Sequence, residues 1–417
     1  MDTSQKTLKR ALTLPLITFF GLGNIVGAGI YALLGKVAGE AGYYAPLSFL
    51  AASVIAAFSA LSYAELSARF PESGGVSVFL YEGFHLHWLS RIVGLLIVSA
   101  GILSSAAITH AFAGYFKATL SSYSPAIQLV PSALIIALLL FILAALAAWG
   151  IKQSVAVVSF LALLQIAGLG LVIWVGVTNV PVIQPTLQTA QEALPAYSII
   201  GVFAGAFLAF YAYLGFEDMV NVAEEVEAPQ RTMPRAILLA LIIAMLLYSV
   251  VTIIAVLQIE PHLLAKSDAP LALIYSTATG RSPVFIGLIG MFAVVNGALI
   301  QLVMASRLLY GMSNRGWLPA WFSRIHSSTR TPLNSTLVVA LLILVFAIML
   351  PMVTLAEMTS SLILIVFILI NLALIRIKKQ QPQPEGVTIF PPWIPKLGLA
   401  TACTFLLLNI IRNIVSS

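Results

Sequence analysis

Long apolar runs separated by short polar segments recur from one end of the chain to the other. Each run is roughly 20 residues long, the length that a helix rising about 1.5 Å per residue needs to cross a hydrocarbon core of about 30 Å. We count eleven runs, centred near residues 26, 56, 103, 141, 165, 211, 246, 297, 342, 365 and 403. The pattern predicts an all-α polytopic membrane protein with eleven transmembrane helices.

The polar segments between the runs are too short for a separate soluble domain. We therefore interpret residues 1–417 as a single transmembrane domain. The segment from Pro71 to Ser90 is too polar to span, and it is either an amphipathic element along the inner interface or an ordinary loop. Residues 378–386 are predicted to form a short flexible loop with the sequence KKQQPQPEG.

Composition supports this class, since 60% of residues are hydrophobic and 9% charged, whereas a soluble domain carries about 25% charged residues. The apolar run after Leu12 continues without a small-residue cleavage site, so we interpret it as a retained first helix. The one cysteine, Cys403, excludes an internal disulfide and a cysteine cluster for metal. We expect no metal and no cofactor.

The distribution of basic residues predicts the orientation. With the amino terminus inside, inner loops hold sixteen of the 21 Lys and Arg residues, and Lys36, Lys117, Lys266, Arg281 and Arg412 lie outside. We therefore attribute the net charge of +6 to the basic inner loops that set membrane orientation, and not to nucleic-acid binding. We expect a multi-pass protein of the cytoplasmic membrane with a cytoplasmic amino terminus.

The first span contains five glycines within residues 21–35, GLGNIVGAGIYALLG. If it unwinds around Gly27, Ala28 and Gly29, the amide groups there and at the start of the next half-helix point into a cavity. A helix amino terminus favours a carboxylate there without a basic side chain. The alternative is helix packing through a Gly23/Gly27 GxxxG step, which we favour when this span is taken alone.

A second interrupted span lies five spans later, in residues 205–227. It places Gly215 among aromatic residues and then two carboxylates, Glu217 and Asp218, inside an apolar run. Because five is odd, two groups of five spans cross in opposite senses, as in an inverted repeat. We predict repeats over about 13–178 and 197–376, with an extra helix over about 391–413. Unwound backbone at membrane depth is tolerated where it lines a cavity, so paired breaks favour a transporter's central site.

Four segments, in order along the chain, resemble the amino acid/polyamine/organocation permeases. They are GLGNIVGAGIYALLG (21–35), YAELSARFPESGGVSVFLYEGF (63–84), GFEDMVNVAEEVEAPQRTMPRAI (215–237) and ASRLLYGMSNRGWLPAWFSRIH (305–326). The resemblance implies a LeuT-type fold of five plus five inverted helices, with helices 1 and 6 discontinuous, and alternating-access transport. It also implies a substrate carboxylate bound by the backbone of Ile25, Gly27, Ala28, Gly29 and Ile30. The amino group and side chain would be bound by Phe210, Tyr211, Ala212, Tyr213 and Gly215.

The chain departs from this family's pattern in two ways. Many relatives carry a lysine in the fifth helix whose charge stands in for a sodium ion, whereas this chain has Gln165 there. A neutral amide donates hydrogen bonds but supplies no charge. Relatives also usually have twelve spans, while we count eleven.

Several single residues are candidates for coupling or gating. Glu217 is either a protonatable coupling group or a cap of the second half-helix, with neither favoured, and Asp218 is more structural. Gln165 is expected to bond the first-helix bend or to tie two helices. His110 is expected to face the pore, with Ser104 on an overlapping face. Tyr211, Tyr213 and Phe216 are jointly expected to cover bound substrate.

These observations predict a secondary active transporter of L-amino acids, most simply neutral ones, either proton-coupled or an exchanger. No Walker motif is present to bind ATP. The alternative is a transporter or antiporter of cationic amino acids or polyamines; a channel or a non-transporting sensor is less favoured. An enzyme would need a cluster of reactive side chains at one depth, which this sequence lacks. The expected partners are a small amino acid, membrane lipid and, if transport is proton-coupled, protons; the need for an accessory subunit is left open.

Overall fold

The computed structural model describes residues 10–72, 75–121, 123–148, 155–179, 199–326 and 331–416, and these are almost entirely helical. The expected repeat boundary at 197 and the basic residues Lys6, Lys9, Lys152 and Arg330 lie outside the described residues. The elements are α1 Leu14–Ile25, α2 Ala28–Ala41, η1 Gly42–Tyr44, α3 Ala45–Arg69, α4 Gly75–Phe84, α5 His87–Leu120, η2 Pro125–Leu129, α6 Ser132–Ala148, α7 Val155–Thr178, α9 Ile199–Tyr211, η4 Phe216–Glu225, α10 Pro229–Gln258, α11 Pro261–Lys266, α12 Pro270–Thr279, α13 Val284–Asn314, α14 Leu333–Met349, α15 Met352–Gln380 and α16 Trp393–Ser416.

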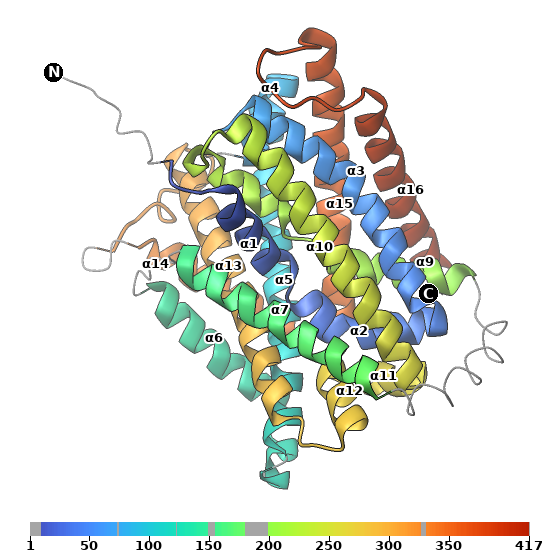
Figure 1. The fold of residues 1–417 in the computed structure, drawn as a ribbon. Helices are drawn as coiled ribbons and strands as arrows, with labels where there is room; N and C mark the ends of the chain where they lie inside the picture. The colour runs from blue at the N-terminus through green and yellow to red at the C-terminus, as the bar shows by residue number, and fades with distance from the viewer. Residues whose placement is uncertain are drawn as a thin grey trace.

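Within the described residues, seven helical stretches are long and apolar enough to cross a membrane, and four shorter apolar helices accompany them. Each predicted centre falls in one of these helices or, for residue 26, between α1 and α2. The prediction of a polytopic helical membrane protein is therefore confirmed. The long helices run side by side along the molecule (Figure 1).

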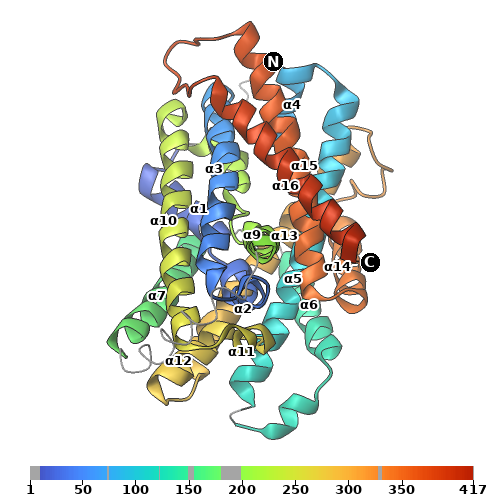
Figure 2. The same ribbon diagram turned by 90° about the vertical axis from the view of Figure 1, so that its right-hand side faces the viewer.

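Two groups of helices flank a central pair of breaks. On one side α3 packs against α9 and α10, and α1 packs against α10; on the other, α5 packs along α13 and α14. Figure 2 shows α9 between these two groups, close to α2. The broken helices thus lie where both groups can contribute side chains to one site.

The breaks are held together by close backbone contact. A Cβ on Gly29 would overlap the backbone of Ala212. Gly215 has φ +125°, in the region that favours glycine, and a Cβ there would lie 2.7 Å from the Asn24 carbonyl carbon. The half after the second break is the 3₁₀ helix η4. Glycine is therefore required at one position of each break.

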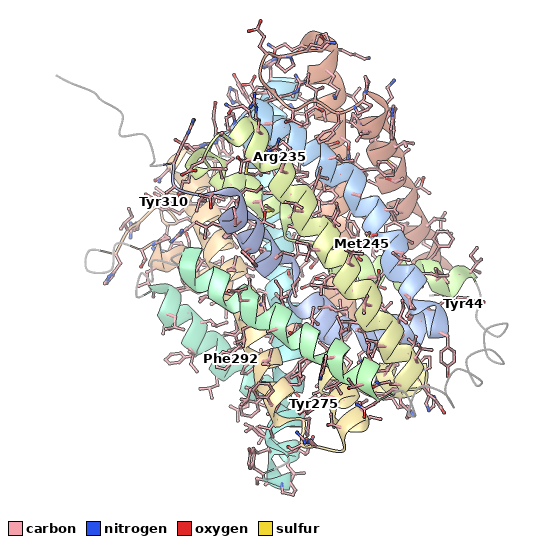
Figure 3. The ribbon with its side chains drawn as sticks, in the orientation of Figure 1. Tyr44, Arg235, Met245, Tyr275, Phe292 and Tyr310 are labelled. Carbon is pink, nitrogen blue, oxygen red and sulfur yellow. The ribbon has the colours of Figure 1, made fainter. Side chains whose placement is uncertain are left out.

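Short helices cover the two ends of the molecule. The segment from Pro71 to Ser90 contains α4, which packs against α15 where Gly83 approaches Ala373. The described residues of this segment are mostly helical and do not form an ordinary loop. At the opposite end, α11 packs against α2, and α12 packs against α7 and α13. Figure 3 shows Arg235 toward the α4 end, Tyr275 toward the α12 end and Met245 between them on α10.

The predicted flexible loop of residues 378–386 begins inside α15 and is anchored after it. Arg69 donates to the Gln381 carbonyl oxygen at 2.9 Å, and Lys378 donates to the Phe390 carbonyl oxygen at 2.6 Å. The prediction of flexibility missed the Arg69 bond because α3 lies about 300 residues earlier in the chain. The connection from α15 to α16 is thereby fastened to α3.

Candidate functional site

A cavity of about 50 Å³ lies where the two helix breaks meet. Its wall combines main chain from the breaks with side chains from α5 and α13. The lining residues are Gly23, Asn24, Ile25, Gly27, Ala28, Gly29, Ser104, Ile108, Tyr211, Leu214, Asp218, Ala293, Gly297, Ile300 and Gln301.

The start of α2 presents free amide groups to this cavity. The first bond of the helix runs from the Tyr31 N–H to the Gly27 carbonyl oxygen at 3.2 Å, so the amides of Gly27 to Ile30 precede it and have no intrahelical acceptor. A Cβ on Gly27 would meet no atom within 4 Å, which shows open space beside this residue. Amide donors at a helix amino terminus suit an anionic group.

Four of the five residues predicted to bind a carboxylate line the cavity, and Ile30 does not. The Ile30 side chain is fully buried in the core. The Ile25 carbonyl oxygen is occupied by a hydrogen bond from the Tyr248 hydroxyl at 2.8 Å. The geometry therefore leaves the amides, and not the Ile25 carbonyl, free for a ligand.

At the second break, Tyr211 faces the cavity. Its hydroxyl oxygen lies 2.9 Å from Ser104 Oγ on α5, and both residues line the cavity wall. This contact joins the two helix groups across the site. Of the residues predicted to cover a substrate, Tyr211 has the placement that this role requires.

The neighbouring aromatic residues point elsewhere. The ring centroid of Phe216 lies 5.4 Å from that of Phe367, and the Tyr213 ring lies 5.2 Å from that of Tyr248. Phe210 packs 5.9 Å from Phe367. The rings of Tyr213 and Phe216 pack against α3, α10 and α15 in this structure, so the joint gating role expected for them stays a prediction.

Among the other residues predicted to bind the amino group, two contribute only main chain at the break. The Ala212 carbonyl oxygen accepts from the Tyr248 hydroxyl at 3.1 Å, and the Gly215 N–H donates to Glu217 Oε2 at 2.8 Å. The side chains of Phe210, Ala212 and Tyr213 do not line the cavity. Of the five residues predicted to bind the amino group, Tyr211 is the one that lines this cavity.

Glu217 and Asp218 face a second cavity of about 430 Å³ that extends toward the α4 end. Asp218 lines both cavities, whereas Glu217 lines the larger one and accepts the Gly215 N–H. Arg307 of α13 lines the larger cavity as well. The geometry is compatible with a capping role of Glu217, and it also places Glu217 at the wall of the larger cavity.

The two cavities adjoin each other, since Ser104, Leu214, Asp218 and Gln301 line both. The opposite end is packed shut around α2. Tyr115 donates to the Tyr31 carbonyl oxygen at 2.7 Å, and Lys36 donates to the Ala265 carbonyl oxygen at 2.6 Å. The central site therefore opens toward the α4 end and is covered at the α11 and α12 end.

Gln165 and His110 lie outside both cavities. Gln165 Nε2 donates to the Ala293 carbonyl oxygen at 3.0 Å, so its side chain ties α7 to α13 and does not reach the bend of the first helix. His110 Nε2 lies 3.1 Å from the Leu350 carbonyl oxygen, at the turn between α14 and α15. His110 therefore lines neither of these two cavities, and its pore-facing position stays a prediction.

Sequence reasoning missed three polar residues at the breaks. Tyr248 bonds both breaks, and Asn24 and Gln301 line the central cavity. Asn24 and Gln301 each interrupt an apolar run, which is a signal that sequence reading could have used. Tyr248 carries no such signal, because tyrosine is ordinary in a membrane helix.

The chain matches the family model described as amino acid permease over residues 12–416. A branched-chain amino acid permease of Bacillus subtilis (strain 168) is 31% identical, with 98% of this chain and 90% of the relative covered. A mitochondrial cationic amino acid transporter of Arabidopsis thaliana is 30% identical, with 91% of this chain and 64% of the relative covered. A methylthioribose transporter of Bacillus subtilis (strain 168) is 27% identical, with 96% and 88% covered.

Proposed function

Because this chain belongs to the amino acid permease family, we propose that it carries neutral L-amino acids across the cytoplasmic membrane by secondary active transport. Amino acid transport is the general activity that the permease relatives support. The proposal of secondary active transport rests on the meeting of two helix breaks at one cavity. Such a cavity offers amide donors and carbonyl acceptors without any charged side chain of its own at the first break.

The substrate's carboxylate is proposed to bind the free amides of Gly27, Ala28 and Gly29, which line the cavity. Tyr211 and Leu214 line the cavity, so their main-chain carbonyl groups would accept hydrogen bonds from its ammonium group, with Asp218 nearby on the cavity wall. Tyr211 and Ser104 would lie over the bound substrate, since they join across the cavity. Because main-chain groups would bind both charged groups of the substrate, the opposite wall of the cavity would contact the substrate's side chain.

That opposite wall supports a neutral substrate. It consists largely of Ile108, Ala293, Gly297 and Ile300 from α5 and α13. A Cβ on Gly297 would lie 3.3 Å from Ile108 Cδ1, so the two helices approach closely there. A cationic side chain placed against this wall would be desolvated without a carboxylate partner, which costs free energy.

Transport of cationic amino acids or polyamines is the second candidate. Asp218 and Glu217 would have to provide the negative charge, and both line the larger cavity. The resemblance to a cationic amino acid transporter also favours this reading. Arg307 opposes it, because it places a positive charge in the same cavity.

We infer that the amino terminus and the α4 end are cytoplasmic. The helix ends there carry most of the basic residues in the described ranges, which is the bias expected of cytoplasmic loops. In that orientation the larger cavity connects the central site to the cytoplasm, as expected for the inward-facing state of an alternating-access cycle. Opening of the α11 and α12 end would complete the cycle.

The test is uptake of a panel of radiolabelled amino acids into liposomes that contain the purified protein. We expect neutral amino acids to enter, and we expect either an inward proton gradient or unlabelled internal amino acid to accelerate their entry. Faster entry of arginine than of any neutral amino acid would replace the proposal with the cationic alternative. Absence of amino acid uptake under every condition would overturn transport.

The Glu217→Gln variant separates proton coupling from exchange. If Glu217 couples protons, the variant loses the acceleration by the gradient while exchange persists. If Glu217 only caps η4, exchange and gradient responses fall together or stay unchanged. Asp268→Asn is the control, since this carboxylate is 74% exposed at the opposite end of the molecule.

A further inference from the structure

The side chain of Asn24 presents two unused hydrogen-bonding atoms at the central cavity. Its Oδ1 and Nδ2 are both buried, and neither has a partner among the described residues. Asn24 lines the cavity one turn before the free amides of α2. A buried polar group without a partner costs free energy that a ligand can recover.

A second carboxamide, Gln301, lines the same cavity from the other helix group. Gln301 belongs to α13 and also borders the larger cavity. A Cβ on Gly101 would lie 3.1 Å from Gln301 Oε1, so this side chain lies across α5 in space that glycine leaves open. Asn24 and Gln301 therefore line one small space from α1 and from α13.

We propose that Asn24 and Gln301 recognise a hydroxyl or carboxamide group on the substrate's side chain, so that the protein prefers neutral polar amino acids over apolar ones of equal size. This inference rests on the proposed function. Each carboxamide offers donors and an acceptor without charge. Hydroxyl and carboxamide groups offer the same combination, whereas a methyl group would leave both atoms of Asn24 unpaired.

Charged side chains match this pair less well. An ammonium group only donates and a carboxylate only accepts, so each would leave part of a carboxamide unpaired. An added carboxylate would also lie near Asp218, which lines the same cavity. The neutral polar class is therefore the one that satisfies both donors and acceptors without a new charge.

Isosteric substrate pairs test the inference in the same liposomes. Threonine matches valine in shape, and asparagine matches leucine closely, so each pair differs mainly in hydrogen bonding. We expect threonine to have a KM roughly tenfold below that of valine, a ratio equivalent to about 1.4 kcal/mol, and asparagine to be favoured over leucine in the same direction. Asn24→Leu and, independently, Gln301→Leu should bring each ratio close to one.

The matched control is Gln165→Leu, which removes a buried carboxamide that contacts Ala293 from behind the cavity wall. It should alter uptake of threonine and valine alike and leave their ratio unchanged. If Asn24→Leu does not fold, Asn24→Ser and stabilisation of the wild-type protein by threonine against valine in thermal unfolding provide the same comparison.

Two outcomes overturn the inference while transport stands. One is a wild-type protein that takes up valine and leucine as well as their polar partners. The other is an Asn24→Leu variant that changes both members of each pair equally, which would place Asn24 against the common part of the substrate. Absence of uptake of any amino acid would instead overturn the proposed function.

Discussion

Tyr248 contacts both helix breaks with one hydroxyl group. The hydroxyl lies 2.8 Å from the Ile25 carbonyl oxygen and 3.1 Å from the Ala212 carbonyl oxygen, and these two carbonyls share its single proton. Each carbonyl has lost its helical partner at a break, so Tyr248 supplies a bond that the unwound backbone cannot make.

We expect Tyr248→Phe to lower the stability of the folded protein by about 1–3 kcal/mol, because two buried carbonyl groups lose their donor. We also expect KM for uptake to rise, since the breaks that bind substrate become less ordered. Thermal unfolding in detergent and liposome uptake measure the two effects. Tyr275→Phe, on α12 away from the breaks, is the control; equal behaviour of both variants would contradict the role of Tyr248.

Gly27 and Gly29, two positions apart, differ in the space that surrounds them. A Cβ at position 29 would overlap the Ala212 backbone, whereas a Cβ at position 27 would enter open space beside the cavity. We expect Gly29→Ala to lower the thermal midpoint strongly and to abolish uptake. Gly27→Ala should fold with a midpoint near that of the wild type but bind substrate several-fold more weakly. A stable, active Gly29→Ala protein would show that the breaks can separate.

The sequence predicts the positions of these breaks because glycine and carboxylate residues within an apolar run are local signals. It does not predict which side chains face the cavity. The helical period ends with α9 at Tyr211 and residues 212–215 form a turn, so the directions of Tyr213 and Phe216 cannot be extended from Tyr211 by counting. The contact of His110 with Leu350 joins residues 240 positions apart and leaves no local pattern.

At the scale of elements, a buried ionic cluster fastens α15 and the following loop to α3. Glu65 is fully buried; it accepts hydrogen bonds from Arg69 at 2.8 Å and from the Phe390 N–H at 3.0 Å, and it lies 2.7 Å from Lys378 Nζ. The side chains of Arg69 and Lys378 are 2% and 8% exposed. One carboxylate thus compensates two buried cations.

We expect Glu65→Gln to lower the free energy of unfolding by about 3–5 kcal/mol, since it leaves both cations without a negative partner. Adding Lys378→Met should recover part of this loss, because one buried charge is then removed. Denaturation in detergent micelles measures both variants. The exposed Glu385→Gln on the same loop is the control, and a loss of equal size there would mean that the cluster contributes little.

The same helices show what sequence patterns can predict at this scale. Apolar run length predicts the eleven spans, whereas the pattern from Pro71 to Ser90 does not distinguish an amphipathic helix from a loop. The anchoring of the loop after α15 is not predictable from the composition of residues 378–386, because its bonding partners belong to α3. Pairing between elements depends on tertiary packing, which a single run does not encode.

At the scale of the whole molecule, the described part of the chain places a larger cavity beside the central site on the α4 side. The opposite end is closed by hydroxyl to carbonyl bonds among α2, α5 and α7, in which Tyr115 donates to Tyr31 and the Tyr31 hydroxyl donates to the Gln165 carbonyl oxygen at 2.7 Å. Opening that end requires α2 to separate from α5 and α7. These two bonds oppose the separation.

We expect Tyr115→Phe to shift the population toward the state that opens at the α12 end. With Cys403→Ser as the background, Ser104→Cys is the sole thiol in the chain and lies on the cavity wall. A membrane-impermeant maleimide should label it faster from the α12 side in the Tyr115→Phe protein than in the parent. Tyr275→Phe is the control. An unchanged labelling rate from the α12 side would show that other contacts hold that end closed.

The division of the central cavity between main chain and side chains has an evolutionary consequence. Every residue type except proline supplies the same amide group, so substitutions near the start of α2 alter the proposed carboxylate contacts only where packing forbids them, as at Gly29. The wall formed by Ile108, Ala293 and Ile300 consists of side chains, so its chemistry changes with each substitution. Single substitutions on α5 and α13 can therefore change which amino acid is accepted while recognition of the part common to all amino acids is inherited unchanged.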